Sequence, residues 1–441
     1  MMSRRSFLRA SAAIAAASWL TPPLRAAAAG RAPAFEADAF VESVGTNIRH
    51  WVSDSPYRQD WDRTLQQLRR AGIRHVRQRL PRPDESWFLR AAGELGREHG
   101  IRHAFGIDVR QGHHPDVRQL DEALATAREL ADVTVAYVGP NEYDGRHHAD
   151  EHWRQRLLEY QAALYERVHA DAALRGRPVI APPMSWPNLL RQFGPDDLGA
   201  SADVANAHTY LLGLPPEGNA AIRDLLEHCG RVWPGKPIMP TEGGYHTAWA
   251  HPSGRGISLE AHGRYVPRAY LELFARGVAR TYLFEFRSRR EGPRSDREAH
   301  FGLIRNDGTE LPAYHAVRHL NALLADPGPP HRPAALPLEI EARGDSLQHL
   351  QFRKRDGACV LVLWLGDASY RIDHPTENPA DNALTVEPVD VAIRCGFDVA
   401  EAQLHRNLQA VEHQTEALPR DGRWRVRVTD AIEVITIAPA R

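Results

Sequence analysis

The stretch YVGPNEYDG occupies residues 137–145, and the interpretation of the whole chain starts from it. A short β-prone run, VTVAYVG (133–139), ends there in Gly139-Pro140, and the pair Asn141-Glu142 follows at once. An apolar run of this length fits a buried strand, and Gly-Pro marks the point where the chain leaves it. A carboxylate at the mouth of a buried strand is either a solvated loop residue or a proton donor. What stands at the ends of the other strands decides between the two.

Seven further strand-like runs alternate with helical patterns between about residues 40 and 325. They are 43–51, 73–80, 101–108, 178–184, 202–211, 237–243 and 280–286. Between them, large apolar side chains recur at helical spacing, as in Trp61, Leu65 and Leu68. Eight βα units in about 280 residues favour a (β/α)8 barrel. A doubly wound sheet is the alternative, but no GxGxxG motif follows the first strand.

The pattern changes after residue 325. A proline-rich segment, DPGPPHRPAALP (326–337), is followed by alternating strand-like runs without a long helical period. We therefore expect a catalytic (β/α)8 barrel over residues 36–325 and a small antiparallel β-sandwich over residues 331–441.

The bulk composition argues against several classes of partner. The chain has 441 residues and a net charge of −1, so nothing global attracts nucleic acid or an anionic membrane. Its three cysteines, Cys229, Cys359 and Cys395, form neither a disulfide framework nor a zinc cluster. Cys359 and Cys395 would pair only if they meet in space.

Residues 1–30 have the pattern of an export signal. Adjacent Arg4-Arg5 precede Ser6-Phe7-Leu8, an Ala-rich apolar stretch and a small-residue run near Ala27–Ala29. This order is typical of a twin-arginine signal peptide. The apolar stretch is short for a membrane span, so we expect a periplasmic or extracellular protein without stable membrane insertion.

Two glutamates stand where a barrel of this kind builds its active site, at the carboxyl ends of strands. Glu142 follows the run 133–139, and Glu242 lies in TEGG (241–244) after the run 237–243. Paired carboxylates are what cleavage of a glycosidic bond requires: one protonated, to donate to the leaving oxygen, and one ionised, to attack the anomeric carbon.

Two other strands carry side chains that would support this pair. In the run 73–80, Arg77 shares a strand face with His75 and Arg79, and an arginine at the barrel mouth can keep a neighbouring glutamate charged. Near the end of the run 202–211, His208 and Tyr210 share a face. The tyrosine hydroxyl would hydrogen-bond the attacking carboxylate.

These motifs resemble clan A of the glycoside hydrolases, the retaining (β/α)8 enzymes that include endo-glucanases, β-xylosidases, mannanases and α-L-iduronidases. The similar positions are Asn141-Glu142, Glu242 in PTEGGY, Arg77 in GIRHVR, His208-x-Tyr210 and the closing segment FGLIRNDGTELPAYHAVRHL (301–320). The resemblance covers roughly residues 40–440, and several families of the clan also carry a β-sandwich behind the barrel.

The resemblance implies a set of roles. Glu142 would be the general acid/base, Glu242 the nucleophile, and Asn141 a hydrogen-bond partner of the sugar 2-hydroxyl. Catalysis would need no metal and no organic cofactor, and the substrate would be a poly- or oligosaccharide. A retaining enzyme requires the two carboxyl groups to lie about 5–5.5 Å apart, whereas a separation near 9 Å would imply inversion.

The resemblance breaks at the eighth strand. Many clan members carry a tryptophan there that forms the floor of the sugar subsite, but this chain has YLFEFRSR (282–289). Phe284 or Phe286 would substitute for it, and we count Phe284 and Glu285 among the substrate-binding residues. Tyr245 and Trp249, just after the nucleophile, are expected to stack on sugar rings.

Several alternatives stay open. The protein is either an active glycosidase or a carbohydrate-binding or scaffold protein on the same fold, and an inverting or transglycosylating enzyme would share the site. The arginine-rich segment 287–297 either binds an acidic sugar or is neutralised by Glu291 and Asp296, and the polar run 146–152 is a solvated loop rather than a metal site. The sugar, the linkage, endo or exo action and the oligomeric state are not decided.

Overall fold

The computed structural model describes residues 34–49, 55–111, 114–146, 151–372 and 375–440. The expected signal segment and most of the polar run 146–152 lie outside these residues. No helix in the described part of the chain is both long and apolar enough to cross a membrane.

A parallel sheet of six strands forms most of the barrel, in the order β11-β2-β3-β4-β7-β8. Its strands are β2 (Val44–Asn47), β3 (His75–Arg79), β4 (Arg102–Gly106), β7 (Thr134–Val138), β8 (Val179–Ile180) and β11 (Thr281–Leu283). The expected strand runs therefore contain the observed strands, which are shorter than the runs.

Two irregular segments close the sheet into a barrel. They end in the parallel strands β9 (Thr209–Tyr210) and β10 (Gly243–Gly244). Single parallel bridges, Ile180 with Val204 and Ala205 with Ile238, connect them to β8 and to each other. On the far side, the Phe284 amide donates to the Gly243 carbonyl at 2.9 Å, which joins β10 to the strand segment of β11. The expected (β/α)8 barrel is confirmed.

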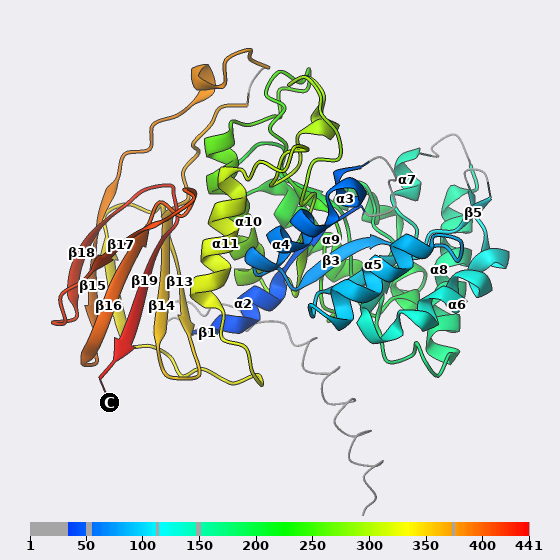
Figure 1. Cartoon of the computed structure of the whole chain (residues 1–441), viewed down its shortest axis with the longest axis horizontal. Coiled ribbons are helices and arrows are strands. Elements are labelled where there is room, and N and C mark those ends of the chain that lie inside the picture. Colours follow the sequence, from blue (N-terminus) through cyan, green and yellow to red (C-terminus); the bar gives the residue numbers. More distant parts are fainter. Residues whose placement is uncertain (1–33, 50–54, 112–113, 147–150, 373–374, 441) are drawn as a thin grey trace, which may run out of the picture.

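Helices surround the barrel because each buries one apolar stripe against the sheet. In α4 (Trp61–Arg70), Leu65 and Leu68 are buried, as their spacing predicts. The other α-helices of the barrel region are α2 (Ala37–Ser43), α3 (Pro56–Gln59), α5 (Ser86–Arg97), α6 (Leu120–Glu129), α7 (Tyr143–Arg146), α8 (Trp153–Ala170), α9 (Ala220–Val232), α10 (Leu259–Ala275) and α11 (Pro312–Leu324). In Figure 1, α3 and α7, which follow strands, lie on the upper side, and α2, which precedes β2, lies on the lower side.

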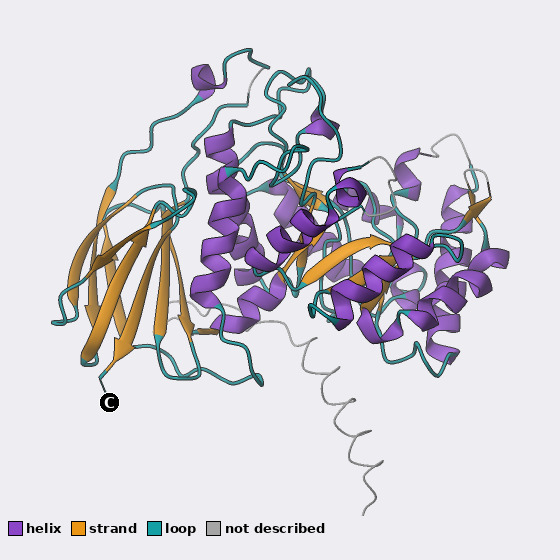
Figure 2. Cartoon of the chain, in the orientation of Figure 1, coloured by secondary structure: helices purple, strands orange, loops and turns teal. Residues whose placement is uncertain are grey.

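The C-terminal part is a two-layer antiparallel sandwich, drawn at the left of Figure 2. Its larger sheet has the order β1-β13-β14-β19-β16-β17 and its smaller sheet the order β12-β15-β18. The strands are β1 (Phe35–Glu36), β12 (Leu338–Ala342), β13 (Leu347–Arg353), β14 (Cys359–Leu365), β15 (Val389–Cys395), β16 (Val399–Arg406), β17 (Gln414–Ala417), β18 (Arg423–Val428) and β19 (Glu433–Pro439). Cys359 and Cys395 are not bonded to each other, and Cys229 is free as well.

The first described strand belongs to the sandwich rather than to the barrel. β1 pairs in parallel with β13, with Phe35 opposite Phe352. Phe35 and Phe352 also pack against Phe274 of α10, with ring centroids 5.1 and 6.0 Å away, and Phe40 of α2 completes the group. A continuous apolar core therefore joins the two domains, with α10 and α11 between them (Figure 1).

The sandwich also reaches the upper side of the barrel. Residues 366–372 and 375–388, between β14 and β15, rise there as the orange segment of Figure 1. The Thr376 amide donates to the Trp249 carbonyl at 3.0 Å. Trp364 of β14 donates to the carboxylate of Glu217, which also pairs with the buried Arg268 of α10. The segment between β9 and α9 is thus held by contacts from the sandwich.

Candidate active site

The backbone after β7 brings Glu142 to the barrel mouth. A Cβ atom at Gly139 would lie 2.0 Å from the Oε1 atom of Gln161, so a larger residue where the strand ends would displace this side chain. The backbone N–H of Asn141 donates to the Asp108 carboxylate at 3.1 Å, which holds Asn141 in place. Glu142 itself has a φ of 45°, a left-handed conformation that costs a non-glycine residue about 1–2 kcal/mol. Its amide donates to the Pro183 carbonyl at 3.2 Å, which ties it to the segment after β8.

The segment before β10 places Glu242 opposite. A Cβ atom at Gly243 would lie 2.4 Å from the Thr209 carbonyl oxygen, so this glycine allows β9 and β10 to approach closely. Asn47, at the end of β2, donates to the Thr241 carbonyl at 3.0 Å from the other side. The backbone next to Glu242 is therefore fixed by β9 and by the side chain of Asn47 from β2.

The two glutamates face each other across His208. One carboxylate oxygen of Glu142 and one of Glu242 lie within 4.8 Å of each other. The Nδ1 atom of His208 lies 2.6 Å from Glu142 Oε1 and 3.6 Å from Glu242 Oε2. His208 is fully buried, whereas the Glu142 side chain is 24% exposed and that of Glu242 only 11%. Glu242, the less exposed carboxylate of the pair, has more charged neighbours than Glu142.

Glu242 is surrounded by groups that favour its ionised form. Burial alone would raise its pKa, but the positive charges of His208, Arg77 and Arg49 and the hydroxyl of Tyr210 lower it to about 2. Arg77 forms an ion pair with Oε1, and Tyr210 donates to Oε2 at 2.9 Å. Burial raises the pKa of Tyr210 far above its usual value, so its hydroxyl stays protonated and remains a donor.

Arg77 also links the two strands that carry the glutamates. Besides Glu242, its guanidinium donates to the side-chain oxygen of Asn141 and to that of Asn47, the latter at 3.2 Å. Arg79 turns away to Glu85, and His75 pairs with Glu42 at 2.6 Å. Of the three polar residues on this face of β3, Arg77 is the one that the structure brings to the pair.

A short hydrogen-bond chain holds His208 from behind. Asn206 Nδ2 donates to Thr241 Oγ1 at 3.0 Å, and Thr241 Oγ1 lies 3.2 Å from His208 Nε2. Thr241 Oγ1 also donates to Asn206 Oδ1 at 3.3 Å, so the ring of His208 is held at Nε2 while its Nδ1 atom faces Glu142. The side chains of Asn206, Thr241 and His208 are all buried.

The end of β11 adds a second arginine–glutamate contact. Glu285 is buried, and its Oε2 atom lies 3.3 Å from Arg49 Nε. Burial raises the pKa of Glu285 to about 7, and Arg49 opposes this shift. The same Arg49 guanidinium lies 4.5 Å from the centre of the Phe284 ring, and that ring packs 6.5 Å from the ring of Tyr210. Phe284 and Glu285 thus belong to the surroundings of the pair, as expected.

Tyr245 and Trp249, which were expected to stack on sugar rings, make contacts with other side chains. Tyr245 is only 3% exposed; its ring packs on Tyr265, and its hydroxyl donates to the Leu214 carbonyl at 2.9 Å. The guanidinium of Arg294 lies 4.0 Å from the centre of the Trp249 ring. The structure therefore does not bring Tyr245 and Trp249 to the carboxylate pair.

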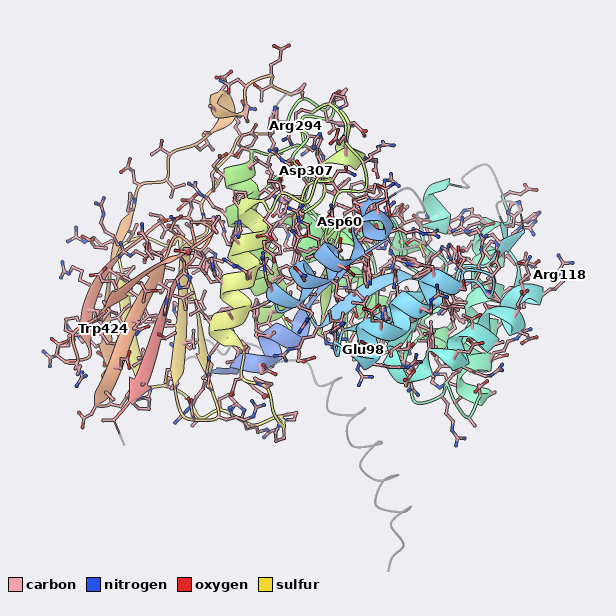
Figure 3. All side chains as sticks on the ribbon, in the orientation of Figure 1. Asp60, Glu98, Arg118, Arg294, Asp307 and Trp424 are labelled. Atoms are coloured by element: carbon pink, nitrogen blue, oxygen red, sulfur yellow. The ribbon has the colours of Figure 1, made fainter. Side chains whose placement is uncertain are left out.

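The arginine-rich segment after β11 is paired with nearby acids. Arg287 contacts Asp60 at 3.0 Å, Arg289 contacts Glu298 at 3.1 Å, and Arg290 contacts Asp296 at 2.9 Å. Figure 3 shows Asp60 and Arg294 on the upper side of the molecule. Of the two acids expected to neutralise the segment, Asp296 does so. These contacts give no support to an acidic sugar as the substrate.

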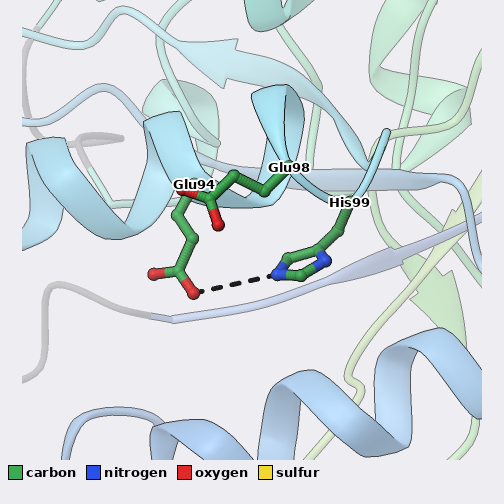
Figure 4. A group of neighbouring side chains, drawn as sticks. All are labelled: Glu94, Glu98 and His99. Atoms are coloured by element: carbon green, nitrogen blue, oxygen red, sulfur yellow. Dashed lines mark ion pairs between the residues drawn. The ribbon is translucent and has the colours of Figure 1, made fainter.

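Among the residues that the structure describes, two groups of side chains have spacings that a metal ion would tolerate. Glu142, His208 and Glu242 form one, but Arg77 and Tyr210 already occupy both oxygens of Glu242, and Arg77 would repel a cation. The second group, Glu94, Glu98 and His99 at the end of α5, lies on the lower side of the barrel (Figure 3, Figure 4). Its ring-to-carboxylate contact is a 3.8 Å ion pair between His99 and Glu94, without a ligand-like geometry.

Comparison with known proteins bears on the fold. No protein-family model and no curated protein sequence matches the chain. A solved structure of a family 39 glycoside hydrolase from Bacteroides cellulosilyticus WH2 is similar with a TM-score of 0.63 and 15% identity, covering 92% of this chain and 83% of that one. A monomeric β-xylosidase from Caulobacter crescentus CB15 is similar with a TM-score of 0.61 and 14% identity, covering 96% and 99%. A glucosidase from Croceicoccus marinus has a TM-score of 0.57 and 11% identity, covering 86% and 92%.

These similarities extend over the barrel and the sandwich together. The fold, a (β/α)8 barrel followed by a C-terminal β-sandwich, is shared with these glycoside hydrolase structures, and it is the fold that the motifs predicted. At such low identity the fold alone is established. The activity has to be argued from the side chains at the barrel mouth.

Proposed function

We propose that the protein is a retaining glycoside hydrolase that cleaves O-glycosidic bonds of a carbohydrate by double displacement. The observation that carries the proposal is the distance of at most 4.8 Å between carboxylate oxygens of Glu142 and Glu242. Retaining enzymes place the two carboxyl groups about 5–5.5 Å apart, whereas inverting enzymes need about 6.5–9.5 Å to admit a water. An approach this close between the two carboxylates is nearer to the retaining than to the inverting separation.

The surroundings of the two acids assign their roles. Glu242 is held ionised at neutral pH by Arg77 and Tyr210, which suits a nucleophile. Glu142 has no arginine partner among the described contacts; its Oε1 atom lies 2.6 Å from His208 Nδ1, and it is the more exposed of the two. Such a position suits a general acid that must reach the leaving oxygen.

The reaction then proceeds in two balanced steps. A Glu242 oxygen attacks the anomeric carbon while Glu142 gives its proton to the leaving oxygen, which departs as an alcohol. A water then attacks the glycosyl-enzyme and passes its proton to Glu142, and Glu242 is released as a carboxylate. Asn141, which Arg77 holds by its side-chain oxygen, has its amide nitrogen to offer to a sugar hydroxyl.

A screen of aryl glycosides and polysaccharides tests the proposal. We expect the wild-type protein to hydrolyse at least one of them, and Glu242→Ala and Glu142→Ala to lose that activity. For Glu142→Ala the loss should be about 10²–10⁴-fold, and smallest for substrates whose leaving group needs no proton. Activity retained in Glu242→Ala would show that the nucleophile is misassigned.

Azide rescue separates the two roles and the two stereochemical outcomes. In Glu242→Ala, azide replaces the carboxylate and should give a glycosyl azide of inverted configuration. In Glu142→Ala, azide attacks the covalent intermediate and should give an azide of retained configuration. A wild-type product of inverted configuration, measured by time-resolved NMR, would instead identify an inverting enzyme.

The same screen addresses the non-catalytic alternative. A carbohydrate-binding or scaffold protein would bind an oligosaccharide without turnover, and the glutamate variants would alter affinity alone. The ordered pair of acids favours turnover.

We propose export through the twin-arginine route as the location of this activity. The proposal rests on Arg4-Arg5 and the small-residue run that follows the apolar stretch. Replacement of Arg4 and Arg5 by lysines should retain the protein inside the cell, as measured by fractionation. Unchanged export of this variant would contradict the proposal.

A further inference from the structure

A cavity of about 710 Å³ begins at Glu142 and extends away from Glu242. Glu142 is among its lining residues, and Glu242 is not. Its walls come from the segment after β8, the segment after β9 and the start of α9. The volume falls within the range of about 300–1,000 Å³ of small-molecule sites.

The walls of this cavity are mainly apolar. Trp186, which is 44% exposed, Leu189, Leu212 and Ala221 line it. Trp186 is the most exposed of the aromatic side chains in the described part of the chain, and an uncovered indole needs an explanation.

Few polar groups in the cavity are available to a ligand. The Ser185 hydroxyl donates to the Asp144 carboxylate, so its hydrogen is already committed. Besides Glu142, the remaining polar side chains of the wall are Asn188 and Asp224. Among the described residues, no lysine, arginine or histidine lines the cavity. A sugar would leave most of its hydroxyl groups without partners on such a surface, which costs free energy.

The backbone is strained at two points of the same cavity. The non-glycine residues with positive φ in the described part of the chain are Glu142, Leu212 and Asn407. Asparagine tolerates this conformation, but Leu212, with a φ of 56°, has no polar side-chain atom that could stabilise it locally. Contacts around the neighbouring Gly213 keep the segment in place: a Cβ atom there would lie 2.7 Å from Ile372 of the sandwich. The fold therefore maintains a strained leucine where its side chain meets the cavity.

We propose that this cavity is the leaving-group site and that it selects an apolar aglycone rather than a second sugar. The inference rests on the proposed function, because the group that Glu142 protonates must lie on the Glu142 side of the pair. An alkyl chain or hydrophobic ring would lie against the Trp186 indole, between Leu189 and Leu212, with its glycosidic oxygen at the Glu142 carboxyl. The physiological substrate class is then the glycoside of a hydrophobic alcohol.

Alkyl glycosides test this directly, because their leaving alcohols differ in apolar surface but hardly in acidity. With the glycone found in the activity screen, kcat/KM is measured for the methyl, propyl, hexyl and octyl glycosides and for a disaccharide with the same glycone. Each methylene that becomes buried contributes about 0.8 kcal/mol, or about fourfold in kcat/KM. We expect a rise of at least tenfold from methyl to hexyl, and a hexyl glycoside preferred over the disaccharide.

Two variants assign the effect to the cavity. Trp186→Ala removes the indole, and Leu212→Asn places a polar side chain on a residue type that accepts the left-handed backbone. Both should reduce the ratio of hexyl to methyl kcat/KM several-fold, a ratio that a general loss of folded enzyme does not change. Val411→Ala is the control, because Val411 is 66% exposed on the sandwich, and it should keep the wild-type ratio.

The outcomes are distinguishable from a failure of the proposed function. If no glycoside is hydrolysed, the proposed function itself is wrong. If the methyl glycoside is cleaved but kcat/KM is flat along the series, or the disaccharide is the better substrate, the apolar site is wrong. A wild-type ratio in both Trp186→Ala and Leu212→Asn would also overturn it.

Discussion

At the scale of single residues, the charge of Glu242 is set by its neighbours and not by its burial. Burial raises the pKa of this carboxyl, yet three positive side chains and one hydroxyl bring it to about 2. The Tyr210 hydroxyl is the neutral member of that group, so its removal changes one hydrogen bond without adding or deleting a charge.

Tyr210→Phe should therefore slow the reaction and change its pH dependence. A hydrogen bond to a charged group contributes about 1.5–3 kcal/mol, so we expect kcat/KM to fall about ten- to a hundredfold. Since the hydroxyl favours the ionised form, the pKa of Glu242 rises in the variant, and the acidic limb of the pH–rate profile moves to higher pH. The control is Tyr137→Phe, which removes a buried hydroxyl that donates to the Ala127 carbonyl of α6, far from the pair. An unmoved acidic limb would contradict the assignment.

Thr241 offers a second test, because its hydroxyl connects Asn206 to His208. Thr241→Val keeps the shape and removes the hydroxyl, so the ring of His208 loses the partner at Nε2 that fixes its orientation toward Glu142. We expect kcat to fall about tenfold, the value of one hydrogen bond, with little change in KM. Thr241→Ser restores the hydroxyl and should restore kcat. If valine and serine behave alike, the chain from Asn206 to His208 has no role in positioning.

The ionisable residues of the site were easier to predict from the sequence than the residues that hold them in place. Glu142, Glu242, Arg77, His208 and Tyr210 could be recognised because each stands at a strand end with a matching chemistry. Asn47 and Arg49 share a face of the first strand, and the period-two pattern of that run contained this signal. Asn206 gave no local signal, because it acts through a tertiary contact with Thr241. Trp186, directly before the 3-10 segment η3 (Pro187–Gln192), had only the general signal of an aromatic residue in a loop after a strand.

At the scale of elements, helices were easier to predict than strands. The helical stripes are long, and each contains several apolar repeats, as in α4 and α9. β8, β9 and β10 have two residues each, too few for a pattern of their own, and their runs were recognised by apolar content and by flanking turns. The parallel pairing of β1 with β13 joins positions about 320 residues apart and leaves no trace in local sequence.

That pairing suggests a test of how the elements hold the two domains together. Phe352 of β13 packs against Phe35, Phe40 and Phe274, which belong to β1, α2 and α10. Phe352→Ala should lower the free energy of unfolding by about 3–5 kcal/mol, as measured by urea denaturation. Phe397→Ala is the matched control, since Phe397 is only partly buried and packs within the sandwich, and it should cost less. Equal losses in the two variants would show that the aromatic group does not join the domains.

At the scale of the whole molecule, buried titratable groups make stability depend on pH in two opposing directions. Burial lowers the pKa of several histidines below the usual 6.5 to about 3 or 4: His75, His103, His246, His262, His315 and His405. Their contribution is complete above pH 6.5 and is lost as the pH falls, because the unfolded chain then binds more protons. Burial raises the pKa of Glu285 and Glu433 to about 7, and their contribution is lost as the pH rises through 7.

The histidines outnumber the two glutamates, so the wild-type protein should become more stable as the pH rises from 4.5 to 6.5. Urea titrations at intervals of half a pH unit would measure this rise in the free energy of unfolding. A maximum of stability near pH 4.5 would mean that these histidines are charged in the folded protein, against their lowered pKa values.

Glu285→Gln isolates the opposing term, because glutamine copies the neutral carboxyl and never ionises. Below pH 4.5 the folded and unfolded wild-type chains both carry a protonated Glu285, and the variant should match the wild type. As the pH rises to 8, the wild type loses up to about 3 kcal/mol from a pKa shift of this size, so the variant becomes relatively more stable. Arg49 limits the gain, since the ionised glutamate is its ion-pair partner at 3.3 Å. Glu416→Gln, on the exposed strand β17, should show no such trend. If the difference between Glu285→Gln and the wild type stayed constant from pH 4 to 8, Glu285 would not take up a proton in this range. The buried carboxyl beside the Glu142–Glu242 pair would then be ionised throughout.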